Sequence, residues 1–83
     1  MLHIRLIHVS DKVLHEGDVD RVVLPGVLGE FEISEGHIAI VALLASGEIA
    51  IHPTPGKDAA LKEITIEQGL MRFDGRQLQA VVE

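Results

Sequence analysis

Cysteine, tryptophan and tyrosine are all absent from this sequence of 83 residues, and phenylalanine occurs only twice. The absence of cysteine excludes disulfides, thiol chemistry and cysteine-based zinc sites. The scarcity of aromatic rings removes the platforms on which nucleic-acid bases stack. Lysine and arginine are few, 7 against 13 acidic residues, and the net charge of −6 repels phosphate backbones. We therefore expect no nucleic-acid partner.

Long hydrophobic runs are also missing. The longest unbroken apolar run covers residues 38–45, whereas a membrane-spanning helix needs about 20 residues. The N-terminal stretch contains His3 and Arg5 and lacks a small-residue cleavage site, so we expect no signal peptide. The length and the apolar content predict one domain over residues 1–83, soluble or peripherally attached.

The apolar residues that are present follow a period of two. Leu2, Ile4 and Leu6 alternate with polar residues, which predicts a strand with one buried face. The apolar phase then passes to Ile7 and Val9, which predicts a bulge or a strand that changes sheets. Turn signals recur every 8–12 residues along the chain. The sequence therefore predicts an all-β fold, a flattened antiparallel β-sandwich of about ten short strands.

The middle of the chain predicts a hairpin, a loop and a further strand. A two-residue turn at residues 46–47 would pair Leu44 with Ile49, which places apolar residues on one face. A polar loop is predicted over residues 53–58, and a strand from about Lys62.

A second hairpin is predicted near the C-terminal end. Asp-Gly at residues 74–75 is a strong signal for a type I′ turn. Such a turn would pair Met71 with Leu78, again apolar against apolar.

Motifs for chemistry are weak throughout. The five histidines contain neither an HxH nor an HExxH pair, and the serines all lie at turn signals where serine is common. We expect no catalytic residues, no metal site and no cofactor. One alternative is a lipoyl- or biotinyl-type carrier domain, because Lys12 lies at a turn in a small acidic β-rich chain.

An ordered set of turn motifs carries a family resemblance. Residues 17–26 read GDVDRVVLPG, residues 29–40 read GEFEISEGHIAI, and residues 69–73 read GLMRF. In this order they resemble the epsilon subunit family of F-type ATP synthases, whose signature reads G-x-V-D-x-V-x-L-P-G followed by G-E-F-G-I-L-P-G-H-A-P-L. The sequence departs from that signature at Glu32, Glu35 and Ala39, where the family has glycine, proline and proline.

The resemblance implies a role as a non-catalytic part of the rotor. It implies a central-stalk subunit that links the gamma subunit to the c-ring and couples ion-driven rotation to ATP synthesis. The protein would then lie peripherally at the cytoplasmic face of the bacterial plasma membrane. For the polar loops of the c-ring, the expected contacts are Leu28, Gly29, Glu30 and Phe31. For the gamma subunit, they are His37, Ala42 and Val9.

Members of the family commonly continue into an inhibitory C-terminal helical hairpin. The present sequence ends at Glu83, where the linker to that hairpin would begin. We therefore expect a short form that does not inhibit ATP hydrolysis by inserting helices.

Overall fold

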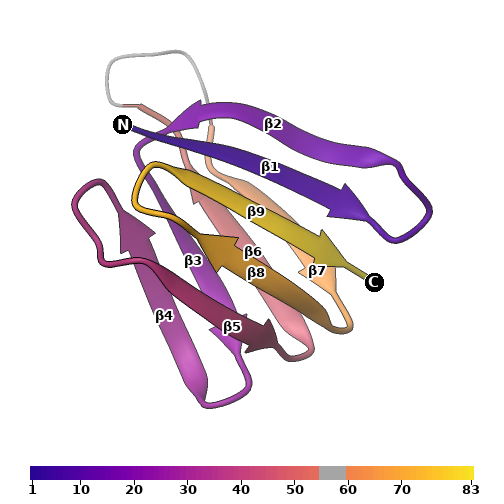
Figure 1. Cartoon of the computed structure of the whole chain (residues 1–83). Coiled ribbons are helices and arrows are strands. Elements are labelled where there is room, and N and C mark those ends of the chain that lie inside the picture. Colours follow the sequence, from indigo (N-terminus) through magenta and orange to yellow (C-terminus); the bar gives the residue numbers. More distant parts are fainter. Residues whose placement is uncertain (55–59) are drawn as a thin grey trace.

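Nine β-strands and no helix make up the part of the chain that the structure describes (Figure 1). The computed structural model describes residues 1–54 and 60–83. The strands are β1 (Leu2–His8), β2 (Val13–Val19), β3 (Arg21–Gly26), β4 (Gly29–Ser34), β5 (Ile40–Leu44), β6 (Gly47–His52), β7 (Lys62–Ile66), β8 (Gly69–Phe73) and β9 (Gln77–Val82). The predicted all-β sandwich is confirmed, and so is the strand that begins at Lys62.

The strands form two layers that face each other (Figure 1). One layer has the order β2-β1-β9-β8-β5, and the other consists of β4, β3, β6 and β7. The layers are joined where the end of β3 meets β5. There the Val27 amide donates to the Leu43 carbonyl at 3.1 Å, and the Ala45 amide donates to the Pro25 carbonyl at 2.7 Å. The two sheets are thus continuous along one side of the sandwich.

Alternating side chains from both layers fill the core. The buried apolar residues are Leu2, Ile4, Leu6, Val19, Val22, Leu24, Ile33, Leu44, Ile49, Ile51, Ile66, Met71, Phe73, Leu78, Ala80 and Val82. Among the described residues no polar or charged residue is buried. Each large side chain of this set contributes about 1.5–3 kcal/mol by leaving water, so the period of two is the main determinant of the fold.

The sandwich is not purely antiparallel, which corrects one part of the prediction. β1 and β9 run parallel, with His3 opposite Gln77 and His8 opposite Val82. Parallel neighbours need a long crossover, and here nearly the whole chain lies between the two strands. No local turn signal could have revealed that pair.

The predicted irregularity after Leu6 is present. The pairing of β1 with β2 slips between Leu6 and Ile7, as in a β-bulge. The pairing of β1 with β9 continues without a slip, and Ile7 is only half-buried. The extra apolar residues therefore lie on the outer face of the sheet.

The predicted hairpin at residues 46–47 is wrong. β5 pairs with β8 and touches the end of β3, whereas β6 pairs with β3 and β7. The turn carries the chain from one layer to the other, so Leu44 and Ile49 are both buried without being register partners. Apolar residues face each other when two strands pair within a sheet and also when two strands pack across the core. The pattern alone therefore could not distinguish a hairpin from a crossing between layers.

The second predicted hairpin exists, but its turn lies one residue later. The Asp74 amide donates to the Gln77 carbonyl at 3.2 Å, and Met71 lies opposite Ala80. Gly75 has φ +106°, which suits glycine at the first central position of the turn. When the turn shifts by one residue, the register partner of each β8 residue shifts by two residues along β9. Residues two apart on a strand lie on the same face, so the buried face is unchanged.

Most of the loop predicted over residues 53–58 lies outside the residues that the structure describes. Within residues 1–54 and 60–83, no helix has the length and apolar character required to cross a membrane.

Candidate docking surfaces

The tip of the β3–β4 hairpin projects from one end of the molecule. Gly26 and Gly29 are register partners, so the turn consists of Val27 and Leu28 alone. Gly29 has φ +128°, a conformation that glycine adopts without strain. The turn leaves the Leu28 side chain fully exposed, and Glu30 is exposed beside it. The structure therefore brings the four residues expected at the c-ring, 28–31, together at a protruding tip.

A groove of about 580 Å³ runs between this tip and β5. It is lined by residues 26–31 on the hairpin side and by residues 40–43 on the β5 side. Apart from Glu30, its side chains are apolar. Phe31 and Ala42 are half-buried and pack against the core, so they form a firm wall. The groove suits an apolar side chain of another protein.

The three residues expected at the gamma subunit do not form one cluster. Val9 is exposed and lines a second groove of about 390 Å³, whereas Ala42 lines the first groove. His37 lines neither groove. Its ring packs edge-on against Phe73 with centroids 6.2 Å apart, and its Nδ1 lies 2.7 Å from the Ile38 carbonyl oxygen. His37 thus has a structural role in the β4–β5 loop, which the sequence did not reveal.

A row of apolar side chains crosses the outer face of the β1-β9-β8-β5 layer, and sequence reasoning missed it. Strand register aligns Ile7 with Val81, Val81 with Leu70, and Leu70 with Leu43. Val81, Leu70 and Leu43 are 48%, 50% and 60% exposed. Three strand spacings give this outer apolar row a length of about 14 Å. Exposed apolar rows of this kind mark sites of protein association.

The signal for the outer apolar row was present in the sequence. Leu43 and Leu44 are consecutive, as are Leu70 and Met71, and Val81 and Val82. In each pair the second residue is buried and the first is exposed. Strands that are apolar on both faces are typical of sheets covered on both sides, and here the described residues leave the outer side exposed.

The outer apolar row and the tip form one continuous surface. The second groove is lined by Val9, Val27, Leu43 and Val81 among others. Val27 and Leu43 also line the first groove. A partner on the outer face and a partner at the tip would therefore lie side by side.

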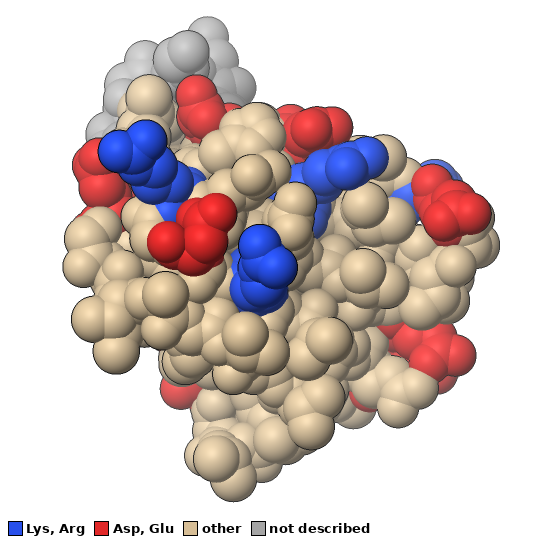
Figure 2. Space-filling view, viewed as in Figure 1, with Lys and Arg blue, Asp and Glu red and all other residues tan. Residues whose placement is uncertain are grey.

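Basic residues flank the outer apolar row. One step along the strands, register aligns Arg5, Gln79 and Arg72 on the same face. Figure 2 views this side of the molecule and shows blue basic residues, some with red acidic residues beside them, next to a broad area without charge. A face with arginines in a chain of net charge −6 favours a partner that carries carboxylates.

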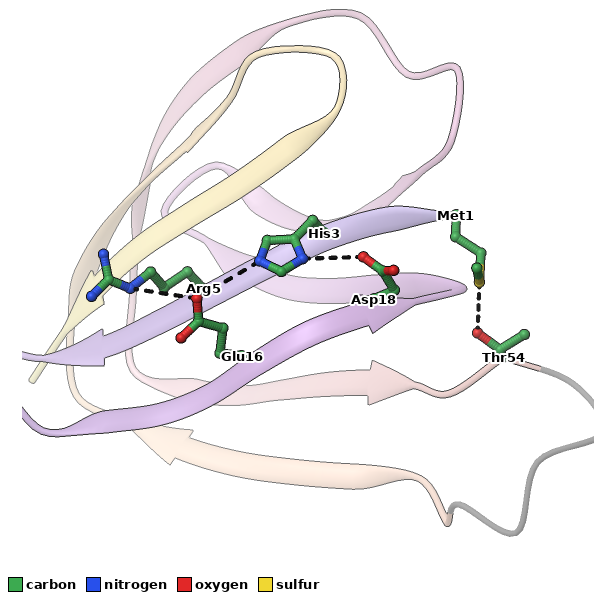
Figure 3. A network of polar contacts seen from close by, with 6 residues as sticks. All are labelled: Met1, His3, Arg5, Glu16, Asp18 and Thr54. Atoms are coloured by element: carbon green, nitrogen blue, oxygen red, sulfur yellow. Dashed lines mark hydrogen bonds and ion pairs between the residues drawn. The ribbon is translucent and has the colours of Figure 1, made fainter.

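A polar network lies beside these arginines on β1 and β2 (Figure 3). His3 Nδ1 lies 3.1 Å from Asp18 Oδ1, and His3 Nε2 lies 3.8 Å from Glu16 Oε2. Arg5 Nε lies 4.0 Å from the same Glu16 oxygen. All four side chains are at least 40% exposed, so each contact contributes at most about 1 kcal/mol. The network links β1 to β2 and leaves Arg5 partly neutralised by Glu16.

The metal and carrier-domain alternatives concern the histidines and Lys12. Among the described residues, no group of three or more histidines and carboxylates is placed to hold a metal ion. Lys12 is exposed in the β1–β2 turn, where its backbone carbonyl accepts a hydrogen bond from the His8 amide at 2.8 Å.

Comparison with known families decides between these interpretations. The model of the beta-sandwich domain of the ATP synthase delta/epsilon chain matches residues 1–83. The chain belongs to this family. The match confirms the resemblance drawn from the turn motifs and favours it over a carrier domain modified at Lys12. The family is a non-catalytic subunit of the synthase, as expected.

Relatives in this family come from several bacteria. The ATP synthase epsilon chain of Sulfurovum sp. is 32% identical over 71 residues, which is 86% of this chain and 53% of the relative. The epsilon chain of Campylobacter fetus is 28% identical over 82 residues, which is 99% of this chain and 60% of the relative. The chain therefore spans little more than half the length of these relatives.

Solved structures with the same fold come from mitochondrial ATP synthases. A chain of the Euglena gracilis synthase has a TM-score of 0.85 and 18% identity, over 98% of this chain and 49% of that chain. A chain of the Tetrahymena thermophila central stalk and c-ring has a TM-score of 0.78 and 14% identity, over 98% and 62%. At these identities the likeness establishes the fold alone.

Proposed function

We propose that this domain is a central-stalk part of an F-type ATP synthase that links the gamma subunit to the c-ring. In this role it couples ion-driven rotation to ATP synthesis and performs no chemistry itself. It is held at the cytoplasmic face of a bacterial plasma membrane, peripherally and through the complex. Family membership and the continuous apolar surface of the described residues support this function.

The outer apolar row is the proposed contact surface for the gamma subunit. A rotor part must transmit torque, which requires a broad, stiff contact. The row lies on strands that are hydrogen-bonded on both sides, and three of its side chains are about half exposed. Val9 and Ala42 lie in the grooves at its margin. His37 contributes by fixing the β4–β5 loop against Phe73.

Co-purification tests this contact. Leu70→Asp places a carboxylate in the middle of the outer apolar row and should abolish recovery with a co-expressed gamma subunit. Leu61→Asp is the matched control, because it makes the same substitution at a leucine that is 47% exposed and lies just before β7, away from this face. Gamma recovered equally with both variants would contradict the assignment of this face.

The tip of the β3–β4 hairpin is the proposed contact site for the c-ring. Leu28, Gly29 and Glu30 protrude together with Phe31 packed behind them, and Glu30 can pair with basic or amide groups on the polar loops of the ring. An exposed ion pair contributes only about 0–1 kcal/mol, so Glu30 sets the register of the contact more than its strength.

A charge reversal at the tip tests this second contact. Glu30→Arg should weaken assembly with the ring while the isolated domain melts at an unchanged temperature. Glu63→Arg makes the same change of charge on β7 and should leave assembly intact. Normal coupled ATP synthesis in the Glu30→Arg enzyme would refute the role of the tip.

A further inference from the structure

The two sides of the sandwich are closed in different ways. On one side the layers are joined by backbone hydrogen bonds between β3 and β5. On the other side β2 and β7 are the terminal strands of the hydrogen-bonded order and do not pair with each other. These two strands lie on the right in Figure 1, one in each layer. Side chains must therefore close this second side.

A lysine and a histidine meet across this gap. Lys62, at the start of β7, donates from its Nζ to the Leu14 carbonyl of β2 at 3.0 Å. The same ammonium lies 3.5 Å from His15 Nδ1. His15 is the register partner of buried Leu6, which places its half-buried side chain toward the interior of the sandwich.

We propose that His15 and Lys62 form a latch between β2 and β7 that is closed while His15 is neutral and released when His15 gains a proton. A neutral imidazole does not repel the Lys62 ammonium, which then donates its hydrogen bond to the Leu14 carbonyl of β2. In the protonated state two cations face each other across the gap. Charged inward-facing residues at sheet edges also hinder edge-to-edge association, so the same pair protects both strands.

The surroundings of His15 favour the neutral form. Burial lowers the pKa of His15 below its ordinary value of 6.5, and the Lys62 ammonium lowers it further. The neighbouring strand β1 presents apolar Leu6 opposite His15. Glu16 and Glu63 follow the two latch residues in sequence, and strand alternation directs them to the outer faces. Neither glutamate therefore faces His15 to offset the repulsion from Lys62.

The direction of the pH effect follows from linkage. The opened state binds a proton with the ordinary affinity of histidine, and the closed state binds it more weakly. Opening is therefore least favourable above pH 6.5 and becomes easier as the pH falls from 6.5 to the lowered pKa of the closed state. One titrating group changes the opening equilibrium by at most about tenfold per pH unit.

Native-state hydrogen exchange between pH 5 and 8, corrected for intrinsic rates, tests the latch. The amides of β7 should lose protection as the pH falls, by more than those of β8 and β9. His15→Gln should make the β7 protection independent of pH, whereas His52→Gln, outside the latch, should retain the dependence. Equal loss in β7, β8 and β9, or an unchanged dependence in His15→Gln, would overturn the proposal.

NMR titration gives a readout that does not require stability to change. The pKa of His15 should lie below that of an unstructured histidine and rise in Lys62→Met. An unchanged His15 pKa in a folded Lys62→Met variant would also overturn the proposal.

Discussion

The tip of the β3–β4 hairpin depends on a glycine that has no room for a side chain. A Cβ on Gly26 would lie 2.7 Å from the Gly29 carbonyl oxygen and 2.8 Å from Phe31 Cε1. The oxygen belongs to the tight turn and cannot retreat, while the ring can move only into the groove that it lines. Gly26→Ala therefore forces a shift of the backbone, of the ring, or of both.

The magnitude follows from the cost of overpacking, about 1–3 kcal/mol. An 83-residue domain has a total stability of roughly 4–12 kcal/mol, so the loss is a substantial fraction. At about 4–8 °C per kcal/mol, the Tm should fall by about 4–24 °C. Thermal unfolding followed by far-ultraviolet circular dichroism measures this shift.

A double-mutant cycle separates the two clashes. In a Phe31→Leu background the ring contact is absent, so Gly26→Ala should cost less than it does alone, while the clash with the Gly29 oxygen remains. A Gly26→Ala variant as stable as the parent would refute the packing argument. A penalty that is identical in both backgrounds would assign the whole effect to the backbone.

Two further predictions concern the core and the β8–β9 turn. Leu78→Ala removes a fully buried side chain and should lower the free energy of unfolding by about 2–5 kcal/mol in urea titrations, and an unchanged midpoint would contradict the burial. Asp74 Oδ1 accepts hydrogen bonds from the amides of Gln77 and Arg76 at 2.8 and 2.9 Å, which hold the pKa of Asp74 below its ordinary value of 3.8. The stabilisation of the fold by the Asp74 carboxylate is therefore present above pH 3.8 and is lost as the pH falls through the lowered pKa. Asp74→Ala should thus be less stable than the parent at pH 6 and nearly equal to it at pH 2. A difference that does not vary with pH would contradict the role of the carboxylate.

Much of the fold could be predicted from local pattern. Alternation of apolar residues located the strands around core positions such as Ile4, Val22 and Ile33, and turn residues located most of their ends. The bulge after Leu6 was also visible, because a change of apolar phase leaves a mark in the sequence. These features depend on a few neighbouring residues, which is why the sequence alone reveals them.

The pairing of strands could not be predicted in the same way. β5 and β6 follow each other across a short turn but belong to different layers, and β1 pairs with β9 from the far end of the chain. Both arrangements depend on long-range closure of the core. Residues 28–31 lie together at the tip because they are consecutive, whereas Val9 and His37 come from separate segments and lie in separate places.

The outer apolar row links the proposed docking surface to the register of the strands. β5, β8 and β9 carry apolar residues on both faces, so hydrophobicity alone does not decide which face is buried. A slip of β8 by one residue would bury Leu70 and expose Met71. The turn resists that slip, because Gly75 supplies the positive φ and Asp74 binds the amides that follow. The β8–β9 turn thus helps to determine which side chains the outer face presents.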